Sequence, residues 1–291
     1  MKNKVLVLGI TGLIGSNLFR CLKSINEIDI YGTYRSHRKI FFNDRNLINN
    51  KLFKCDVSSY QDLLKIIQKI KPNFVINCIG VTKHQKNIAK KIVFEINANF
   101  PQKLAISSKE FSYKLIHIST DCIYSGKKGM YKESDPSDAI DDYGKSKAEG
   151  ERLIDNSLII RTSTIGHEYY TNYGLLNWFL SQDKSCIGFE KAIFSGVPTN
   201  IFSDIIKNII INYHNLSGIY NIAAEPIDKY SLLKIIAQIY KKDISIISDS
   251  SFMIDRSLDG SKFNNLTKSK LPSWEILIES MYDDNQKHIK P

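Results

Sequence analysis

The sequence lacks any long apolar run. No segment is apolar over 18 residues, and the start, "MKNKVLVLGI", holds only a short apolar stretch that glycine and polar residues interrupt. A membrane-spanning helix needs about 20 mostly apolar residues in a row, and a signal peptide needs a longer apolar core than this start provides. We therefore expect a cytoplasmic protein with no membrane partner.

Cysteine is scarce, and its pattern excludes two kinds of structural support. The five cysteines are odd in number and far apart, and no CxxC occurs: Cys21, Cys55, Cys78, Cys122 and Cys186. A disulfide framework needs an even set of cysteines in a secreted chain, and structural zinc needs closely spaced ligand pairs. The sequence therefore predicts neither disulfides nor a metal site.

Acidic residues are outnumbered, 30 against 40 basic ones, which gives a formal net charge of +10. Binding of nucleic acid is one interpretation of such a charge. The lysines are scattered, however, and no zinc-finger, RNP-like or basic-helix pattern occurs. We expect no nucleic-acid partner, and a positive field that favours anionic substrates such as nucleotides.

What the sequence does contain is a regular alternation of short β-branched runs and helix-like segments. This pattern predicts βαβ units, and right-handed crossovers then give an α/β fold with a doubly wound parallel sheet. Strands are expected at 4–8, 28–34, 51–57, 73–79, 113–120 and 157–162, and helices at 13–24, 60–70, 88–108 and 143–156.

The alternation stops after Gly166, which predicts two domains in the 291 residues. Residues 1–165 are expected to bind a nucleotide, and residues 166–291 to form mainly a smaller substrate-binding lobe. The later helices at 202–214 and 230–242 flank a strand at 218–224, and the segment 202–224 is expected to return to the first domain's sheet.

A glycine turn follows the first strand and opens the first helix. "GITGLIG" places Gly9, Gly12 and Gly15 there. Glycine permits a tight turn and close approach of a pyrophosphate, and the helix start offers free N–H groups and the positive end of the helix dipole. The alternative is a plain strand–helix turn, but this position favours dinucleotide binding.

The end of the second strand lacks the acid that would hold the ribose of NAD. It reads "GTYRSHRK", with Arg35, Ser36 and Arg38. Arginine here suits a 2′-phosphate, so NADP is expected and NAD is less favoured, unless the loop is only a solvated basic segment. Asp56 after the third strand is expected to bond the adenine amino group, or else to cap the 60–70 helix.

Two further motifs place reactive groups near each other. "YGKSK" sets Tyr143 and Lys147 four residues apart, which stacks both side chains on one face of a helix. "HISTDCIYSG" sets Ser119, Thr120 and Asp121 at the C-terminal end of the fifth strand, at the edge where open α/β sheets bind ligands. A phenol titrates near about 10, and a neighbouring ammonium favours its phenolate.

With these motifs in order, the sequence resembles the extended short-chain dehydrogenase/reductase family, and most closely its dTDP-4-dehydrorhamnose reductase branch. The matching stretches are "GITGLIG", "NCIGV", "EINANFPQKLA", "STDCIYSG", "YGKSKAEGE" and "LIIRTS". The resemblance implies a Rossmann fold and a catalytic set of Thr120, Tyr143 and Lys147. Thr120 would bond the substrate oxygen, Tyr143 would exchange a proton with it, and Lys147 would bond the nicotinamide ribose.

The resemblance also gives the expected binding residues. Asn97 lies near the active site in this family, although a satisfied polar group in a helix is an equal alternative. The expected cofactor contacts are Gly9, Thr11, Gly12, Leu13, Ile14, Gly15, Arg35, Ser36, Arg38, Asp56, Val57, Cys78, Ile79, Gly80, Asn97, Ser119, Tyr143, Lys147 and Thr162. The expected substrate contacts are Thr82, Thr120, Asp121, Cys122, Tyr143, His167, Asn172, Trp178, Thr199 and Arg256.

Some substrate contacts have other interpretations. The spacing of Trp178 with Leu175 and Phe179 favours a position in the core, and Arg256 could face solvent. His167 lacks the neighbouring ligands that a metal site needs. The segment "GHEYYTNYGLLNWFLSQ" also differs from the loop expected in this branch, so the nucleotide and the sugar stay open, and a UDP-linked amino sugar is an alternative.

The resemblance predicts NADPH-dependent reduction of a nucleotide-linked 4-keto-6-deoxysugar for surface polysaccharide synthesis. Cys122 stands where the related 4,6-dehydratases carry a glutamate, which argues against elimination. A nucleotide-sugar epimerase with a tightly bound cofactor stays open, as does a non-catalytic NADP-binding regulatory subunit. The expected partner is a nucleotide-diphosphate sugar, and a homodimer is a further expectation.

Overall fold

The chain folds into two compact units that are interleaved along the sequence. The computed structural model describes residues 2–36, 51–83, 85, 87–152, 156–169 and 173–289, with side chains through residue 287. The first unit comprises Met1–Ser119, Asp141–Ile159 and Ser203–Gly218, and the second comprises Thr120–Ile140, Ile160–Phe202 and Ile219–Pro291. The boundary near residue 165 is a functional division and stays a prediction.

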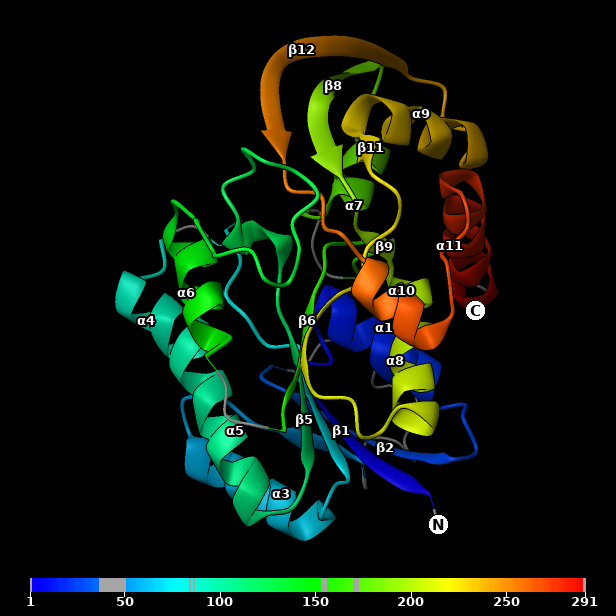
Figure 1. Cartoon of the computed structure of the whole chain (residues 1–291). Helices are drawn as coiled ribbons and strands as arrows, with labels where there is room; N and C mark the ends of the chain where they lie inside the picture. Colours follow the sequence, from blue (N-terminus) through cyan, green and yellow to red (C-terminus); the bar gives the residue numbers. More distant parts are fainter. Residues whose placement is uncertain are drawn as a thin grey trace. The chain divides into compact units, whose positions relative to one another are not determined.

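A parallel seven-stranded sheet has the strand order β10-β6-β5-β4-β1-β2-β3 (Figure 1). Strand order reverses between β1 and β4, which creates the switch point where such sheets bind ligands beyond their carboxyl ends. The predicted doubly wound sheet is therefore confirmed, and β10 does return to it. The strands are β1 (Asn3–Leu8), β2 (Ile28–Tyr34), β3 (Leu52–Lys54), β4 (Phe74–Asn77), β5 (Lys114–Ile118), β6 (Leu158–Arg161) and β10 (Gly218–Asn221).

Helices cover both faces of the sheet in the first unit. Figure 1 shows α1 (Leu13–Leu22) and α8 (Thr199–Asn212) on one face. The other face carries α3 (Tyr60–Ile70), α4 (Lys90–Phe94), α5 (Phe100–Glu110) and α6 (Asp142–Gly150). Helix α3 ends where Lys71 adopts a left-handed conformation (φ 51°) before Pro72, because proline cannot continue the helix.

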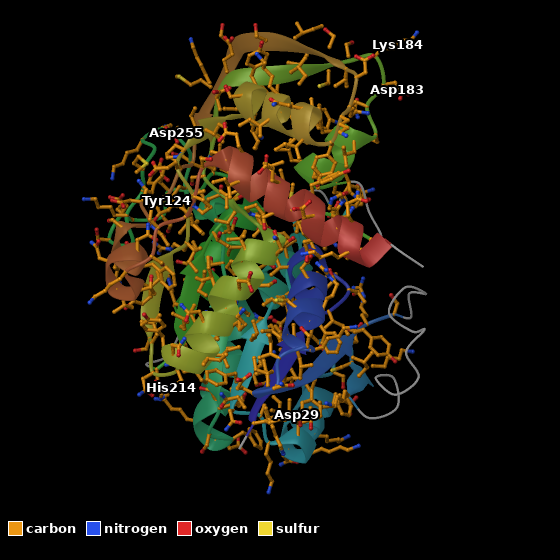
Figure 2. The ribbon with its side chains drawn as sticks, turned by 90° about the vertical axis from the view of Figure 1, so that its right-hand side faces the viewer. Asp29, Tyr124, Asp183, Lys184, His214 and Asp255 are labelled. Carbon is orange, nitrogen blue, oxygen red and sulfur yellow. The ribbon has the colours of Figure 1, made fainter. Side chains whose placement is uncertain are left out.

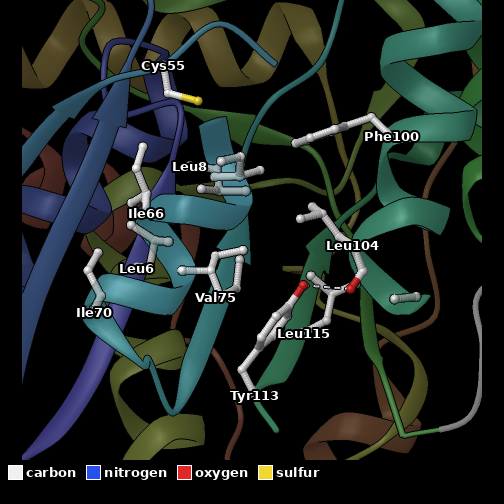
Figure 3. Packing of buried hydrophobic residues seen from close by; sticks show 13 residues of the cluster. Leu6, Leu8, Cys55, Ile66, Ile70, Val75, Phe100, Leu104, Tyr113 and Leu115 are labelled. Carbon is white, nitrogen blue, oxygen red and sulfur yellow. Dashed lines mark hydrogen bonds between the residues drawn. The ribbon is translucent and has the colours of Figure 1, made fainter. Parts of the chain in front are cut away.

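One hydrophobic cluster of the first unit lies between the sheet and helices α3 and α5 (Figure 3). Leu6 and Leu8 of β1 point to this side because side chains alternate along a strand. They pack with Ile67 of α3 and Leu104 of α5, and each of these side chains is fully buried. Burial of one such side chain contributes roughly 1.5–3 kcal/mol, so this core fixes the strands whose carboxyl ends carry the site.

The expected long helix at 88–108 is interrupted by a π-turn at Glu95–Asn99. Pro101 lies at the start of α5, and it has no N–H with which to bond the carbonyl of Asn97 four residues earlier. The wider turn accommodates this missing bond, and such turns are frequent at functional sites. The predicted helix is therefore present, whereas the π-turn within it was not predicted.

The second unit contains a three-stranded sheet in the order β11-β8-β12. The long strands β8 and β12 were not predicted from the sequence. The carbonyl of Gly126 accepts a hydrogen bond from the N–H of Asp255 at 2.8 Å, which ties the loop after Tyr124 to the end of β12 (Figure 2). The elements are β7 (Thr164–Ile165), α7 (Leu175–Leu180), β8 (Ser185–Phe194), β9 (Val197–Pro198), β11 (Ile227–Asp228), α9 (Lys229–Ile239), β12 (Ser245–Asp255), α10 (Ser261–Thr267) and α11 (Trp274–Ile289).

Candidate active site

The glycine turn between β1 and α1 has three glycines with three different surroundings. Gly9 adopts φ +83°, a left-handed conformation that favours glycine. A Cβ on Gly15 would lie 2.3 Å from the carbonyl oxygen of Gly9, so the close packing of the turn on the helix requires glycine there. Gly12, in contrast, is exposed, and a Cβ there would meet only the Gly9 oxygen at 3.6 Å.

The turn fits the pyrophosphate of a dinucleotide. Gly12 is the N-cap of α1, where the fold alone would favour serine or aspartate as a capping side chain. With glycine there, the first-turn N–H groups of α1 receive no side-chain cap, and the neighbouring Thr11, Leu13 and Ile14 are half-buried. Such a helix start binds anions through its N–H groups and its dipole.

The end of β2 presents the basic residues expected at the adenosine end of the cofactor. Arg35 and Ser36 are exposed, and Arg38 lies outside the described residues. The N–H and the hydroxyl of Ser58 both donate to the Asp56 carboxylate and lower its pKa, and the charge of Arg35 lowers it further. Asp56 thus forms a turn before α3 and stays ionised, with Val57 half-buried beside it.

Beyond β4, the chain passes Cys78, Ile79 and Gly80 before reaching the exposed Thr82. Asn97, in the π-turn, holds this loop: its Oδ1 accepts from the N–H of Val81 at 2.9 Å and its Nδ2 donates to the Val81 carbonyl at 2.9 Å. The same Nδ2 lies 3.1 Å from the hydroxyl of Ser146 on α6. Asn97 therefore positions both the loop and α6, and direct contact with the cofactor stays a prediction.

Helix α6 carries the two central residues of the site, one turn apart on the same face. Its N-terminus is capped by Asp141, whose carboxylate accepts from the N–H of Gly144 at 2.7 Å. Tyr143 is half-buried in the first turn, whereas Lys147 is only 4% exposed. The ammonium nitrogen of Lys147 donates to the carbonyl of Ile118, the last residue of β5, at 2.7 Å.

The surroundings of Lys147 lower its pKa to about 8. Burial is the largest cause, and the nearby Glu151 partly opposes it. Burial raises the pKa of the Cys78 thiol to about 12, so this group stays neutral. Lys147 therefore changes its charge within a range that catalysis at moderate pH can use.

Replacing Lys147 with methionine is expected to raise Tm by about 5 °C at pH 7. Because the pKa of Lys147 is lowered, burial of its charged form destabilises the folded state below about pH 8. This cost disappears as pH rises toward the ordinary lysine pKa of about 10.5, so the gain should shrink over that interval. The lost hydrogen bond to Ile118 offsets part of it.

Thermal unfolding between pH 7 and 10 measures this effect. Lys145→Met is the matched control, because Lys145 is exposed on the same helix. A lower Tm for Lys147→Met at pH 7, or a gain that grows with pH, would contradict the cost assigned to the buried charge.

Thr120 begins the second unit and follows directly after Ser119 of the first. Its hydroxyl donates to the Asp121 carboxylate at 3.0 Å and accepts from the N–H of Cys122 at 3.1 Å, which caps a short 3₁₀ turn. Arg256, 134 residues later, donates to the carbonyl of Tyr124 at 2.8 Å and approaches the sulfur of Cys122 at 3.6 Å. The second unit thus brings together Cys122 and Arg256, two predicted substrate residues.

The other predicted residues of the second unit lie in varied surroundings. The ring of His167 bonds the Tyr240 hydroxyl at 2.8 Å, Thr199 is buried against Gly166, and Thr162 donates to the carbonyl of Ser163. Asn172 lies outside the described residues.

The interpretation of Trp178 as a core residue is wrong. Its side chain is 36% exposed, whereas Leu176 and Phe179 are fully buried. Helix α7 therefore turns those two residues inward and leaves the tryptophan at the surface. A contact between Trp178 and the substrate stays a prediction.

Three buried polar residues near Lys147 escaped the sequence interpretation: Asn77, His117 and Glu151. The hydroxyl of Ser119 donates to Glu151 at 2.5 Å, and its predicted contact with the cofactor stays a prediction. Glu151 lies four residues after Lys147 in "YGKSKAEGE", so the spacing on α6 could have found it. Asn77 and His117 are neighbours only through strand pairing, which no local pattern shows.

The described part of the chain contains no group of three or more His, Cys, Asp or Glu side chains arranged to hold a metal ion. Within the same residues, no helix has the length and apolar character that crossing a membrane requires.

The sheet order and the glycine turn define a Rossmann-type α/β protein. A solved structure of dTDP-4-dehydrorhamnose reductase from Bacillus anthracis, in complex with NADP, has the same fold, with a TM-score of 0.80 and 22% identity over 97% of this chain and 99% of that one. The model of the family described as RmlD substrate binding domain matches residues 2–241, and the chain belongs to this family.

Curated relatives match part of the chain. A dTDP-4-dehydrorhamnose reductase from Aggregatibacter actinomycetemcomitans is 31% identical over 182 residues, which are 59% of this chain and 62% of the relative. Methionine adenosyltransferase 2 subunit beta from Danio rerio is 28% identical over 151 residues, 52% of this chain and 43% of the relative. The chain thus spans less than two thirds of the length of either relative.

Proposed function

We propose that the protein reduces the C4 ketone of a nucleotide-linked 4-keto-6-deoxysugar with NADPH. The observation that carries the proposal is the pair on α6, where Lys147 is buried and anchored to the end of β5 one helical turn from Tyr143. Burying an ammonium costs free energy that a purely structural helix would avoid. The family membership and the reductase among the relatives support the same activity.

The roles of the residues follow from the charge that the reaction develops. Bound NADPH supplies the hydride, which adds to the carbonyl carbon and leaves negative charge on the oxygen. Tyr143 gives its proton to that oxygen. The hydroxyl of Thr120 turns from the Asp121 carboxylate and donates its hydrogen bond to the same oxygen. Lys147 binds the nicotinamide ribose and, as an ammonium, stabilises the tyrosinate that remains.

Arg35 is proposed to bind the 2′-phosphate that distinguishes NADPH from NADH. Arg35→Ser should weaken NADPH binding by about 10-fold or more, because a charge-assisted hydrogen bond to phosphate is lost. NADH binding should stay unchanged. Fluorescence titration of both cofactors measures the two affinities, and Lys65→Ser provides a control cation that is exposed on α3. Equal losses for NADPH and NADH would place Arg35 away from the 2′-phosphate.

The decisive experiment is to follow NADPH absorbance with candidate ketosugars. Substrates with dTDP and UDP, including a UDP-linked 4-keto-6-deoxy amino sugar, cover the nucleotides and sugars that the second unit leaves open. Oxidation of one NADPH for each sugar reduced supports a reductase. Absence of turnover with every 4-keto sugar nucleotide would refute it.

Turnover without net NADPH consumption would instead identify an epimerase with a tightly held cofactor. Cys122 weighs against a dehydratase, since a thiol is a poor substitute for a glutamate in elimination.

A second candidate is a non-catalytic subunit that binds NADP. The similarity to methionine adenosyltransferase 2 subunit beta favours it. Recovery of a stable heteromeric complex from cells, together with NADPH binding and no turnover, would support this candidate. For the reductase, we propose a cytoplasmic homodimer that serves surface polysaccharide synthesis.

A further inference from the structure

A chain of buried polar groups connects the loop after β4 to Lys147 within the first unit. The N–H of Ile79 donates to Asn77 Oδ1 at 3.1 Å, and Asn77 Nδ2 lies 3.1 Å from His117 Nδ1. On the other side of the imidazole ring, His117 Nε2 lies 3.5 Å from Lys147 Nζ. Asn77 and His117 face each other across the parallel strands β4 and β5, and neither is exposed to solvent.

The direction of each hydrogen bond follows from Ile79. A backbone N–H can only donate, so the oxygen of the Asn77 amide must face it. The amide nitrogen of Asn77 then faces His117 and donates to Nδ1. A neutral imidazole carries one proton, which must therefore be on Nε2.

The imidazole is held neutral by its surroundings. Burial is the main cause that lowers the pKa of His117 well below its usual range, and the charge of Lys147 lowers it further. The Nε2–H of this neutral ring is directed at Lys147 Nζ. A neutral amine has a lone pair that can accept this proton, whereas an ammonium has none, so the ring favours the amine.

Titratable groups from three elements face the lysine. Glu151, the C-cap of α6, lies four residues after Lys147 and favours the ammonium. Cys78 follows β4 with a neutral thiol. His117 faces the lysine from β5 as a donor, and Tyr143 lies one turn earlier on α6. Among the groups described around Lys147, His117 is therefore the strand residue that favours the neutral amine, whereas Glu151 favours the ammonium.

We propose that Asn77 and His117 are positioning residues that set the charge state of Lys147. Asn77 selects the tautomer of the imidazole, and the imidazole sets the balance between amine and ammonium. The consequence for catalysis rests on the proposed function, because the charge on Lys147 acts on the reaction through Tyr143. Neither Asn77 nor His117 contacts the reacting atoms in this scheme.

The tautomer can be measured without any substrate or cofactor. In protein labelled with ¹⁵N-histidine, long-range ¹H–¹⁵N correlations distinguish Nε2–H from Nδ1–H, and a spectrum of His117→Gln identifies the signals of His117. We expect a neutral ring with its proton on Nε2 from about pH 6 to pH 9. A ring protonated on Nδ1, or an imidazolium, would overturn the proposal whether or not the protein is a reductase.

The effect on Lys147 is measured by the pH profiles of kcat/KM and of NADPH binding. Activity should fall as pH rises through the pKa of Lys147, because the ammonium is lost. His117→Gln offers the lysine an amide oxygen, and His117→Phe removes the donor while keeping a ring. Both variants should move this alkaline fall in activity to higher pH. We expect a shift of about one pH unit for the glutamine variant, because a donor that favours the amine is replaced by an acceptor that favours the ammonium.

The control is His214→Gln, an exposed histidine of the same unit, which should leave both profiles in place. A merely structural role for His117 would lower Tm in both variants and leave the limb where it is, and this result would refute the proposal. If the protein turns over no substrate, the profile of NADPH binding and the tautomer measurement still decide the question.

Discussion

Replacing Tyr143 with phenylalanine is expected to lower kcat for ketone reduction by about 10²–10⁴-fold. The substitution removes the hydroxyl that would protonate the developing alkoxide, and it leaves the aromatic ring in place. Tyr143 is only half-buried, so the folded state should lose little stability. NADPH binding should also persist, because Lys147 keeps its anchor on Ile118.

Steady-state rates, NADPH titration and thermal unfolding together test this expectation. Tyr113→Phe is a matched control with the opposite profile. Tyr113 is buried, and its hydroxyl bonds the carbonyl of Leu104 at 2.6 Å within the core (Figure 3). Loss of the Tyr113 hydroxyl should lower the free energy of unfolding and leave kcat unchanged. General acid catalysis ordinarily contributes at least about 100-fold to the rate. If the kcat of Tyr143→Phe lies within about 10-fold of the parent, Tyr143 does not have the proposed role.

Alanine at Gly15 and at Gly12 should have different consequences, although the two glycines belong to one turn. The Gly15 Cβ would overlap the Gly9 carbonyl at 2.3 Å, so the turn or α1 must move. We expect a loss of about 1–3 kcal/mol or more in the free energy of unfolding, as for other overpacked sites. NADPH binding should also be lost, because the N-terminus of α1 would no longer lie where it can bind the pyrophosphate.

Gly12→Ala should fold normally, since its Cβ would make only an ordinary contact at 3.6 Å and its backbone is extended. The added methyl group would stand where the pyrophosphate approaches, and we expect NADPH binding to weaken by about 10-fold or more. Unfolding in denaturant and NADPH titration separate the two effects. Undiminished binding by Gly12→Ala would show that the turn does not hold the pyrophosphate.

The sequence predicts the sheet well where local signals are strong. Runs such as "IDIYGTY" and "YQDLLKIIQKI" are β2 and α3 in the structure with the same bounds. Strands β8 and β12 were missed because their pairing joins residues about 60 positions apart, such as Cys186 and Ile246, and β12 is largely exposed and polar. Non-local pairing, rather than local propensity, makes these segments strands.

The same division applies to the candidate site. The glycine turn and the pair Tyr143 and Lys147 depend on spacing within one element, and spacing is visible in a sequence. The contact of Asn77 with His117 depends on the register of β4 on β5, and the contact of Arg256 with Cys122 depends on tertiary folding. Such partners become visible only when the chain is folded.

The π-turn at Glu95–Asn99 makes the length of this segment as important as its composition. A π-turn holds one residue more than an α-turn, so deleting a single residue there would remove the wider turn and rotate Asn97 relative to α5. Helix α5 would keep Phe100 and Leu104 facing the core, because the deletion lies before them. The grip of Asn97 on Val81 and Ser146 would be lost. An insertion or deletion at this point would therefore disrupt the site and keep the core packing of α5. No single substitution in α5 would have this effect.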